Sequence, residues 1–207
     1  MKGAFAVRLR QFCSRYGARV MLPVESAELE DVRGFGESDA LAFEELHTGH
    51  ALVSALRYSE SRIFDVIVLD RGILDRRAWF LDELRVGNIT KEEWLRCDDF
   101  LRRSAALRRL TACYFFTCTP NVSLQREYSG ALSKKRGKKM NEESLARKVG
   151  VWKEIYEDTL RFFPNLPCLE VDTTDCFTED DIENIGWIIV EHLLSALEKK
   201  FLTKTPG

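Results

Sequence analysis

Four short apolar runs, each ending in a polar turn, alternate with longer helical patterns along the chain. The runs cover residues 18–24 (ARVMLPV), 66–69 (VIVL), 112–119 (ACYFFTCT) and 168–171 (CLEV). Continuous apolar runs of this length are typical of strands that are buried on both faces. Strands that alternate with helices indicate a parallel sheet with helices on both sides. We therefore predict an α/β fold, a three-layer sandwich with a mostly parallel sheet.

Helical patterns separate these runs, at residues 5–15, 40–58, 90–109, 141–162 and 178–201. Thr90 and Thr178 open capping boxes, which mark the starts of two of these helices. The pattern over 40–58 has five residues at the spacing of one helix face: Phe43, Leu46, His50, Val53 and Leu56. No repeat or linker divides the 207 residues, so we expect a single domain over 1–207.

Charge, hydropathy and cysteine spacing exclude several classes of protein. The net charge of −2 lacks the basic excess of a general nucleic-acid binder, which makes a nucleic-acid partner a poor fit. No apolar run approaches the roughly 20 residues that a membrane span needs, and arginines interrupt the first 24 residues, so neither a span nor a signal-peptide core is expected. The six cysteines have no Cys-x-x-Cys spacing. We expect packed, reduced thiols in a cytoplasmic protein and no zinc site.

Charged side chains follow the predicted strands, as Glu25, Asp70, Arg71, Asp75 and Asp172. The commoner fate of such a residue is a solvated loop charge, but ligands of open α/β sheets bind beyond the carboxyl ends of the strands. The stretch 66–79 (VIVLDRGILDRRAW) is the most specific. There Asp70 could hold a magnesium ion, Arg71 could bind a phosphate bidentately, and Gly72 would permit a sharp turn. Trp79 is expected in the core.

A basic segment follows the third run. Residues 133–140 (SKKRGKKM) carry five positive charges and no acid, and lie between Arg126 and the Arg147–Lys148 pair. Taken alone, such a segment is most often a solvated loop, or a nucleic-acid or localisation patch. Its place between a strand and a helix favours a lid near 126–148 that closes over phosphates.

This order of strands, acids and basic loop resembles the P-loop kinases of nucleosides and nucleoside monophosphates. It is most similar to the deoxynucleoside kinase and thymidylate kinase branch and to related small P-loop ATPase-like proteins, over about residues 5–195. The resemblance implies a P-loop NTPase-like fold, ATP and Mg²⁺ as cofactors, and phosphoryl transfer to a small nucleoside-like or nucleotide-like partner.

Carried onto this sequence, the resemblance implies roles for single residues. Glu25 would act as base near the attacking hydroxyl, Arg71 would contact phosphate, and Asp70 would bind the metal. Asp172 would border the adenine pocket, and His50 and Arg57 would flank the acceptor. The remaining cofactor-binding candidates are basic: Lys2, Arg126, Lys134, Arg136 and Lys138.

One departure from the family is large. Such kinases open with a strand and a Gly-x-x-x-x-Gly-Lys-[Ser/Thr] loop whose amides bind the phosphates. This sequence has no such loop, and Lys2 is either a trace of the loop's lysine or an ordinary lysine. We therefore expect an N-terminally shortened fold whose sheet either keeps two unpaired inner edges or has closed around the gap. The activity is then that of an impaired kinase, or the chain is a non-catalytic binding or scaffold protein.

Overall fold

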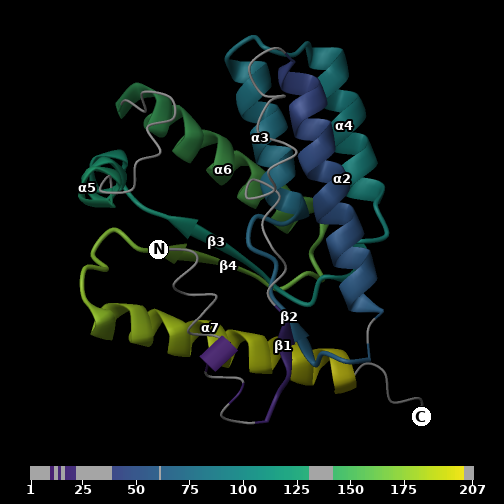
Figure 1. The fold of residues 1–207 in the computed structure, drawn as a ribbon, viewed down its shortest axis with the longest axis vertical. Helices are drawn as coiled ribbons and strands as arrows, with labels where there is room; N and C mark the ends of the chain where they lie inside the picture. The colour runs from purple at the N-terminus through teal and green to yellow at the C-terminus, as the bar shows by residue number, and fades with distance from the viewer. Residues whose placement is uncertain are drawn as a thin grey trace.

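The computed structural model describes residues 10–11, 14, 17–21, 39–60, 62–130 and 142–202. The strands are β1 (Val20–Met21), β2 (Val66–Ile67), β3 (Cys113–Thr117) and β4 (Cys168–Asp172). The helices are α2 (Ala40–Ser59), α3 (Ile73–Arg85), α4 (Lys91–Arg103), α5 (Pro120–Gly130), α6 (Glu142–Phe162) and α7 (Glu179–Leu202), with a short 3₁₀ turn, η3 (Leu107–Arg109) (Figure 1). Each of the four predicted strand regions contains a strand. The predicted helix over 5–15 lies largely outside the described residues.

The strands form two separate parallel pairs. Val20 lies opposite Val66 in the β1–β2 pair, and Cys113 lies opposite Cys168 in the β3–β4 pair. Within the described residues no ladder joins β2 to β3, so each pair is a two-stranded sheet of its own. The parallel direction is as predicted. The sequence analysis left open whether the sheet keeps two unpaired inner edges or closes around the missing strand. Within the described residues the two pairs stay separate, so closure is wrong.

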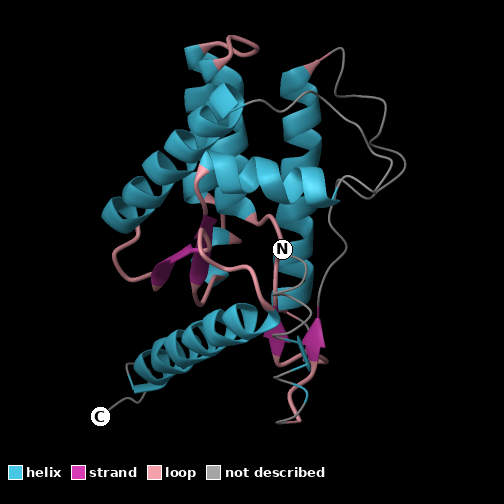
Figure 2. Ribbon diagram, turned by 90° about the vertical axis from the view of Figure 1, so that its left-hand side faces the viewer, coloured by secondary structure: helices cyan, strands magenta, loops and turns pink. Residues whose placement is uncertain are grey.

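Helices cover both faces of the β3–β4 pair. One face packs against α3 and α6, and the other packs against α7, which crosses on the far side of the strands (Figure 2). Alternate residues of β3 serve the two faces. Cys113 and Phe115 join the first cluster, while Tyr114 and Phe116 join the second. This arrangement is the predicted three-layer sandwich, and it explains why the third run is apolar without alternation.

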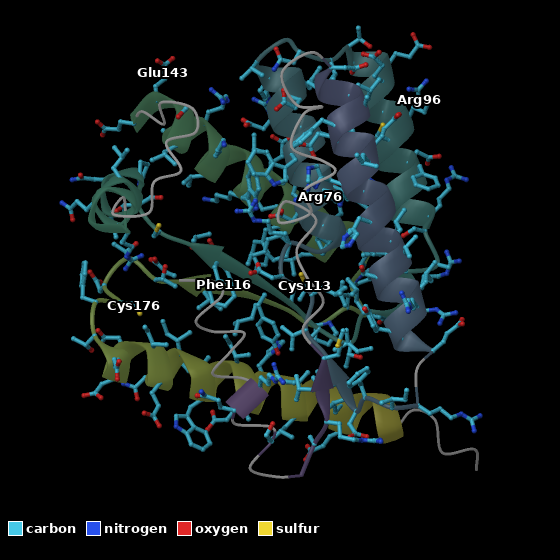
Figure 3. The ribbon with its side chains drawn as sticks, viewed as in Figure 1. Arg76, Arg96, Cys113, Phe116, Glu143 and Cys176 are labelled. Carbon is cyan, nitrogen blue, oxygen red and sulfur yellow. The ribbon has the colours of Figure 1, made fainter. Side chains whose placement is uncertain are left out.

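The buried face of α2 differs from the predicted one. Leu46 and Val53 are 45% and 62% exposed. The buried residues lie one position away on the helix, and all but the two alanines carry charged or hydrogen-bonding side chains: Glu44, His47, Thr48, Ala51, Ser54 and Ala55. A helix packs on the face that fits its neighbours in shape and charge, and here α3 offers the side chain of Arg76 to Glu44. Arg76 lies in the interior, whereas Arg96 points outward from α4 (Figure 3).

Helix boundaries follow the capping signals. Thr90 and Glu93 form both bonds of a capping box at the start of α4, and Thr178 exchanges bonds with Asp181 at the start of α7. The predicted helix over 90–109 ends earlier, at Arg103, because Ser104 has an extended conformation. Helix α5 directly after β3 was not predicted. None of the described helices is both long and apolar enough to cross a bilayer.

A buried ion network fastens α3 to α4 and α6. The Arg77 side chain is fully buried and donates to Asp98 at 2.6 Å and to Asp158. Arg102 contacts the same two carboxylates, at 2.6 and 2.8 Å. Because each buried charge has an opposite charge within hydrogen-bond distance, the cost of burying it is largely offset.

Candidate functional site

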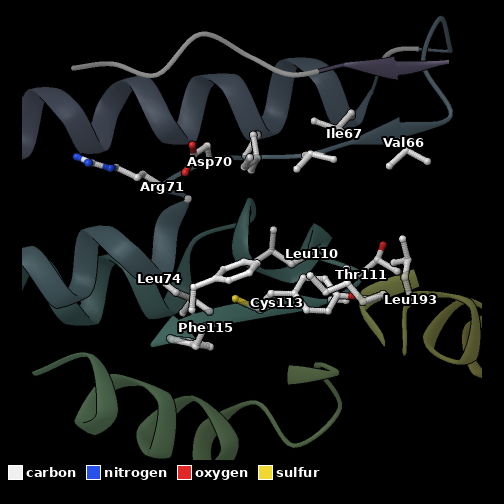
Figure 4. Close-up of a pocket in the computed structure, with 18 of the residues that line it drawn as sticks. Val66, Ile67, Asp70, Arg71, Leu74, Leu110, Thr111, Cys113, Phe115 and Leu193 are labelled. Atoms are coloured by element: carbon white, nitrogen blue, oxygen red, sulfur yellow. The ribbon is translucent and has the colours of Figure 1, made fainter. Parts of the chain in front are cut away.

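A cavity of about 590 Å³ separates β2 from β3 (Figure 4). Its walls are residues 66–69 of β2 and its continuation, and residues 110–116 on the side of β3. Ile189 and Leu193 of α7 and Leu74 of α3 also line it. Most of the lining is apolar, and Asp70 and Arg71 lie at the end where β2 leaves the sheet. The predicted polar turn therefore opens onto a cavity at the carboxyl edge of the strands.

The turn after β2 has an unusual backbone. Arg71 has a φ of +56°, and it is the sole non-glycine residue with positive φ among those the structure describes. Gly72 has a φ of −77°, and a Cβ there would meet Leu69 Cβ at an ordinary 3.6 Å. The prediction that Gly72 makes the turn is wrong, because Arg71 adopts the left-handed conformation itself. A side chain in this region costs about 1 kcal/mol or more, and such residues cluster at binding sites.

Asp70 in this turn and Asp75 in the first turn of α3 have different surroundings. Asp75 accepts hydrogen bonds from the indole N–H groups of Trp79 and Trp152, at 3.0 and 3.1 Å, and pairs with Arg76. Asp70 has no hydrogen-bond or ion-pair partner in the described part of the chain. Asp75 therefore holds two tryptophans and an arginine in place, while the Asp70 carboxylate is available to a ligand.

The Asp70 carboxylate could bind Mg²⁺ only together with ligands that the protein does not supply. No group of three His, Cys, Asp or Glu side chains among the described residues could hold a metal ion by itself. Mg²⁺ is commonly bound by one or two carboxylates together with substrate phosphates and water. A lone carboxylate without a protein partner meets that requirement, so Asp70 would hold the ion only as part of a phosphate complex.

Trp79 lies beside this turn and is half-buried. Its ring packs edge-on against Trp152 at 5.3 Å between centroids, and Lys148 Nζ lies 4.3 Å from the centre of the Trp79 ring. Burial lowers the pKa of Lys148. Trp79 was expected in the core, but it lies at the core's edge, where its ring contacts Trp152 and Lys148.

A buried polar cluster next to the turn was missed by the sequence analysis. Glu44 of α2 faces Arg76 of α3 at 3.5 Å, and both side chains are 5% exposed. Burial raises the pKa of Glu44 to about 7, although Arg76 opposes the rise. Burial and the nearby Arg76 lower the pKa of His47 to about 4. Two features of the sequence could have indicated this cluster. Residues 44, 47, 48 and 51 recur at helical spacing, and the chain contains a second Asp-Arg pair, Asp75-Arg76.

The two residues of α2 that were expected to flank the acceptor, His50 and Arg57, are not among the buried residues of this polar cluster. His50 is half-buried, and the Arg57 side chain is exposed with its guanidinium 5.8 Å from the Tyr58 ring.

Cys113 lines the cavity, where burial raises the pKa of its thiol far above the usual range. That shift keeps Cys113 protonated and unreactive near neutral pH.

Arg126 and Asp172 meet at the turn after β4. The Arg126 guanidinium donates to the carbonyl oxygens of Thr173 and, at 2.7 Å, of Cys176, and lies 5.4 Å from the Phe177 ring. Asp172 accepts from the N–H and hydroxyl of Thr174 at 2.9 and 2.6 Å, and these bonds lower its pKa. Arg126 thus fixes the turn that carries the Asp172 carboxylate.

The structure places four of the nine predicted site residues. Asp70 and Arg71 lie together after β2, and Arg126 and Asp172 lie together after β4. The other five lie outside the described residues: Lys2, Glu25, Lys134, Arg136 and Lys138. The central part of the predicted lid, residues 131–141, falls there as well.

Comparison with solved structures identifies the fold. A deoxyadenosine kinase from M. mycoides with bound dCTP matches with a TM-score of 0.63 and 13% identity, over 92% of this chain and 93% of that chain. The chain has the deoxynucleoside kinase fold. Deoxyadenosine kinase structures from the same organism with bound dATP, and with the products dCMP and a flexible dCDP, match with TM-scores of 0.61 and 0.60 at 14% identity. They cover 91% and 92% of this chain and 95% and 93% of theirs.

Sequence comparison adds nothing to this likeness, because neither a protein-family model nor a curated protein matches the chain. The deoxynucleoside kinase fold is nevertheless the one that the order of strands and acids led us to expect. Its P-loop NTPase-like architecture and parallel strands are confirmed.

Proposed function

We propose that this chain transfers a phosphoryl group from ATP to a hydroxyl of a nucleoside, nucleotide or similar small acceptor. The observation that carries the proposal is the Asp70-Arg71 turn at the mouth of the cavity, with Arg71 at a φ of +56° and Asp70 without a protein partner. The shared fold supports it, since the matching deoxyadenosine kinases hold dCTP, dATP, dCMP and dCDP.

In this proposal the side chains act mainly by position and charge, because phosphoryl transfer asks little covalent chemistry of the protein. Arg71 stabilises negative charge on the transferring group through its planar guanidinium. Asp70 holds Mg²⁺, which neutralises phosphate charge when it is bound. Glu25 accepts the proton of the attacking hydroxyl. Asp172, on the turn that Arg126 holds, borders the adenine.

The basic residues outside the described part of the chain complete the proposed phosphate site: Lys2, Lys134, Arg136 and Lys138. The sequence contains no Gly-rich phosphate-binding loop. Each hydrogen bond to a charged group contributes about 1.5–3 kcal/mol, so the lack of several lowers affinity or rate by about three orders of magnitude. We therefore propose slow transfer and weak ATP binding. The same observation favours the second candidate, a non-catalytic binding or scaffold protein derived from a kinase.

The experiment measures ATP binding by calorimetry in the presence of Mg²⁺, and transfer of labelled γ-phosphate to a panel of nucleosides and nucleotides. We expect weak binding and slow transfer, and we expect Asp70→Asn and Arg71→Gln to reduce transfer by a further factor of about 100. Asp99→Asn is the matched control, because Asp99 is an exposed acid of α4 paired with Arg103.

The outcomes separate the candidates. ATP binding without transfer above the uncatalysed rate would support the non-catalytic candidate. Transfer that is equal in Asp70→Asn and the wild type would reject the proposed site. Tight ATP binding with ordinary turnover would contradict the expected impairment.

A further inference from the structure

Lys148 of α6 is a half-buried cation that has no acidic partner in the described part of the chain. Its Nζ atom lies 4.3 Å from the centre of the Trp79 ring. The carboxylate of Asp82 acts on Lys148 from nearby but is bound by Arg147, which donates to it at 2.7 Å. An ammonium group has three N–H donors, and contact with an aromatic face replaces only part of the hydration that burial removes. Lys148 therefore has donors that are available to an anion.

The aromatic surface under Lys148 is held in place. The indole N–H groups of Trp79 and Trp152 donate to the two oxygens of the Asp75 carboxylate, at 3.0 and 3.1 Å. The two rings pack at 90° to each other. Because one carboxylate holds both rings, the position of the Lys148 ammonium group is set by α3 and α6 together, and it is not that of a freely moving surface lysine.

The charges around Lys148 also favour an anion. Burial is the main cause of its lowered pKa, and the positive charges of Arg147 and Arg71 lower the pKa further. Asp82 and Glu83 act in the opposite direction, but they do not outweigh these effects. Cations of two separate segments, Arg71 before α3 and Lys148 on α6, thus lie close enough to disfavour each other's charge. A phosphate near Lys148 would offset that cost through charge-assisted hydrogen bonds.

The place of Lys148 along α3 indicates which substrate would carry this anion. Trp79 comes six residues after Ile73, the first residue of α3, which is about 9 Å along the helix axis at 1.5 Å per residue. Helix α3 runs away from the strands, whereas the turn proposed to border the adenine follows the carboxyl end of β4 (Figure 1). An anion at Lys148 is therefore separate from both the transferred phosphoryl group and the adenine of ATP. It belongs to the acceptor.

We propose that the acceptor is an anion: a small alcohol that already carries a phosphate group, which Lys148 binds while the hydroxyl lies at Asp70 and Arg71. This inference rests on the proposed function. In the transfer, the hydroxyl oxygen forms a bond to the γ-phosphorus of ATP as the bond from that phosphorus to the departing ADP oxygen breaks, and the hydroxyl proton passes to Glu25. The acceptor's own phosphate contributes to binding and is chemically unchanged.

The test measures binding to the full chain by calorimetry, without ATP, so that it does not depend on transfer. The probes are adenosine 3′-monophosphate and ribose 5-phosphate, each compared with its unphosphorylated parent, adenosine or ribose. We expect a phosphate compound to bind at least about tenfold more tightly than its parent. The compound with the larger gain distinguishes a nucleotide from a sugar phosphate as the acceptor. If neither phosphate compound binds more tightly than its parent, the proposal is overturned.

Variants of α6 assign the gain to Lys148. Lys148→Met keeps an apolar stem over Trp79 but removes the charge, and should bring the affinity of the phosphate compound to within about twofold of its parent. Lys148→Arg should keep the preference for phosphate. Lys153→Met is the matched control, because Lys153 is an exposed lysine of the same helix, and should leave binding unchanged. Equal losses for the phosphate compound and its parent in Lys148→Met would show that Lys148 only packs on Trp79, and would refute the inference.

Transfer of labelled γ-phosphate to the same four compounds separates this inference from the proposed function. Equal kcat/KM for adenosine and its monophosphate, and for ribose and its phosphate, would reject the inference while the proposed function stands. Phosphate-dependent binding through Lys148 without transfer to any acceptor would support phosphate binding at Lys148 and reject the proposed function.

Discussion

Glu44 makes the stability of this protein depend on pH in a direction that is unusual for a carboxylate. In the unfolded chain its pKa is near 4.5, whereas burial between α2 and α3 raises the pKa of Glu44 to about 7 in the folded protein. Between these two pH values the folded state binds one more proton than the unfolded state, so stability is lost as the pH rises. At about 1.4 kcal/mol per pKa unit, the full loss is about 3 kcal/mol, most of it between pH 5 and pH 8.

Replacing Glu44 with glutamine removes this titration while keeping the shape of the side chain. We expect the stability of the wild type relative to Glu44→Gln to fall by about 2–3 kcal/mol from pH 5 to pH 8. The assay is urea unfolding followed by tryptophan fluorescence at several pH values. His47, whose pKa is lowered to about 4, favours the folded state as the pH rises from 4 to 6.5, but it is present in both proteins and cancels in the comparison.

Glu45→Gln is the matched control, because Glu45 is the next residue on α2 and is exposed. Its stability relative to the wild type should vary with pH by less than about 0.5 kcal/mol. If the difference between Glu44→Gln and the wild type were equally flat, burial would not be raising the pKa of Glu44 and the reasoning would be wrong.

Two further predictions concern stability alone. Arg77→Met should lower the free energy of unfolding by about 3–5 kcal/mol, because it leaves buried carboxylates of α4 and α6 without one of their positive partners. Arg85→Met is the control in the same urea assay. It removes an exposed pair with Glu154 and should lower the free energy of unfolding by less than about 1 kcal/mol. Thr90→Ala should cost about 1 kcal/mol through loss of the α4 cap, with faster amide exchange in the first turn of that helix as the local readout.

The sequence predicted those parts of the fold that follow from local chemistry. Buried parallel strands read as continuous apolar runs, and the threonine caps fix helix starts through bonds to residues three positions away. The acid-arginine turn after residues 66–69 was placed correctly because chain order alone puts it at the end of a strand.

The parts that failed depend on contacts between distant segments. The face of α2 was mistaken because Glu44 is buried only by virtue of Arg76, which lies 32 residues later. Hydrophobic periodicity cannot anticipate an ion pair that replaces apolar packing. Gly72 was expected to make the turn after β2, whereas Arg71 itself carries the positive φ. That assignment depends on how α3 leaves the sheet, which composition does not specify.

Helix α3 packs against both hydrophobic clusters, one on each side of the break between the two strand pairs. One side of this helix gives Ile73 and Phe80 to the cluster under α2 and α4, and another gives Leu74 and Leu81 to the cluster under β3 and α6. Among the described residues no ladder joins β2 to β3, so these α3 side chains are a main packing connection between the two clusters. Arg71 lies two positions before Ile73, the first residue of α3. A ligand that binds Arg71 therefore contacts the start of the helix that packs against both hydrophobic clusters.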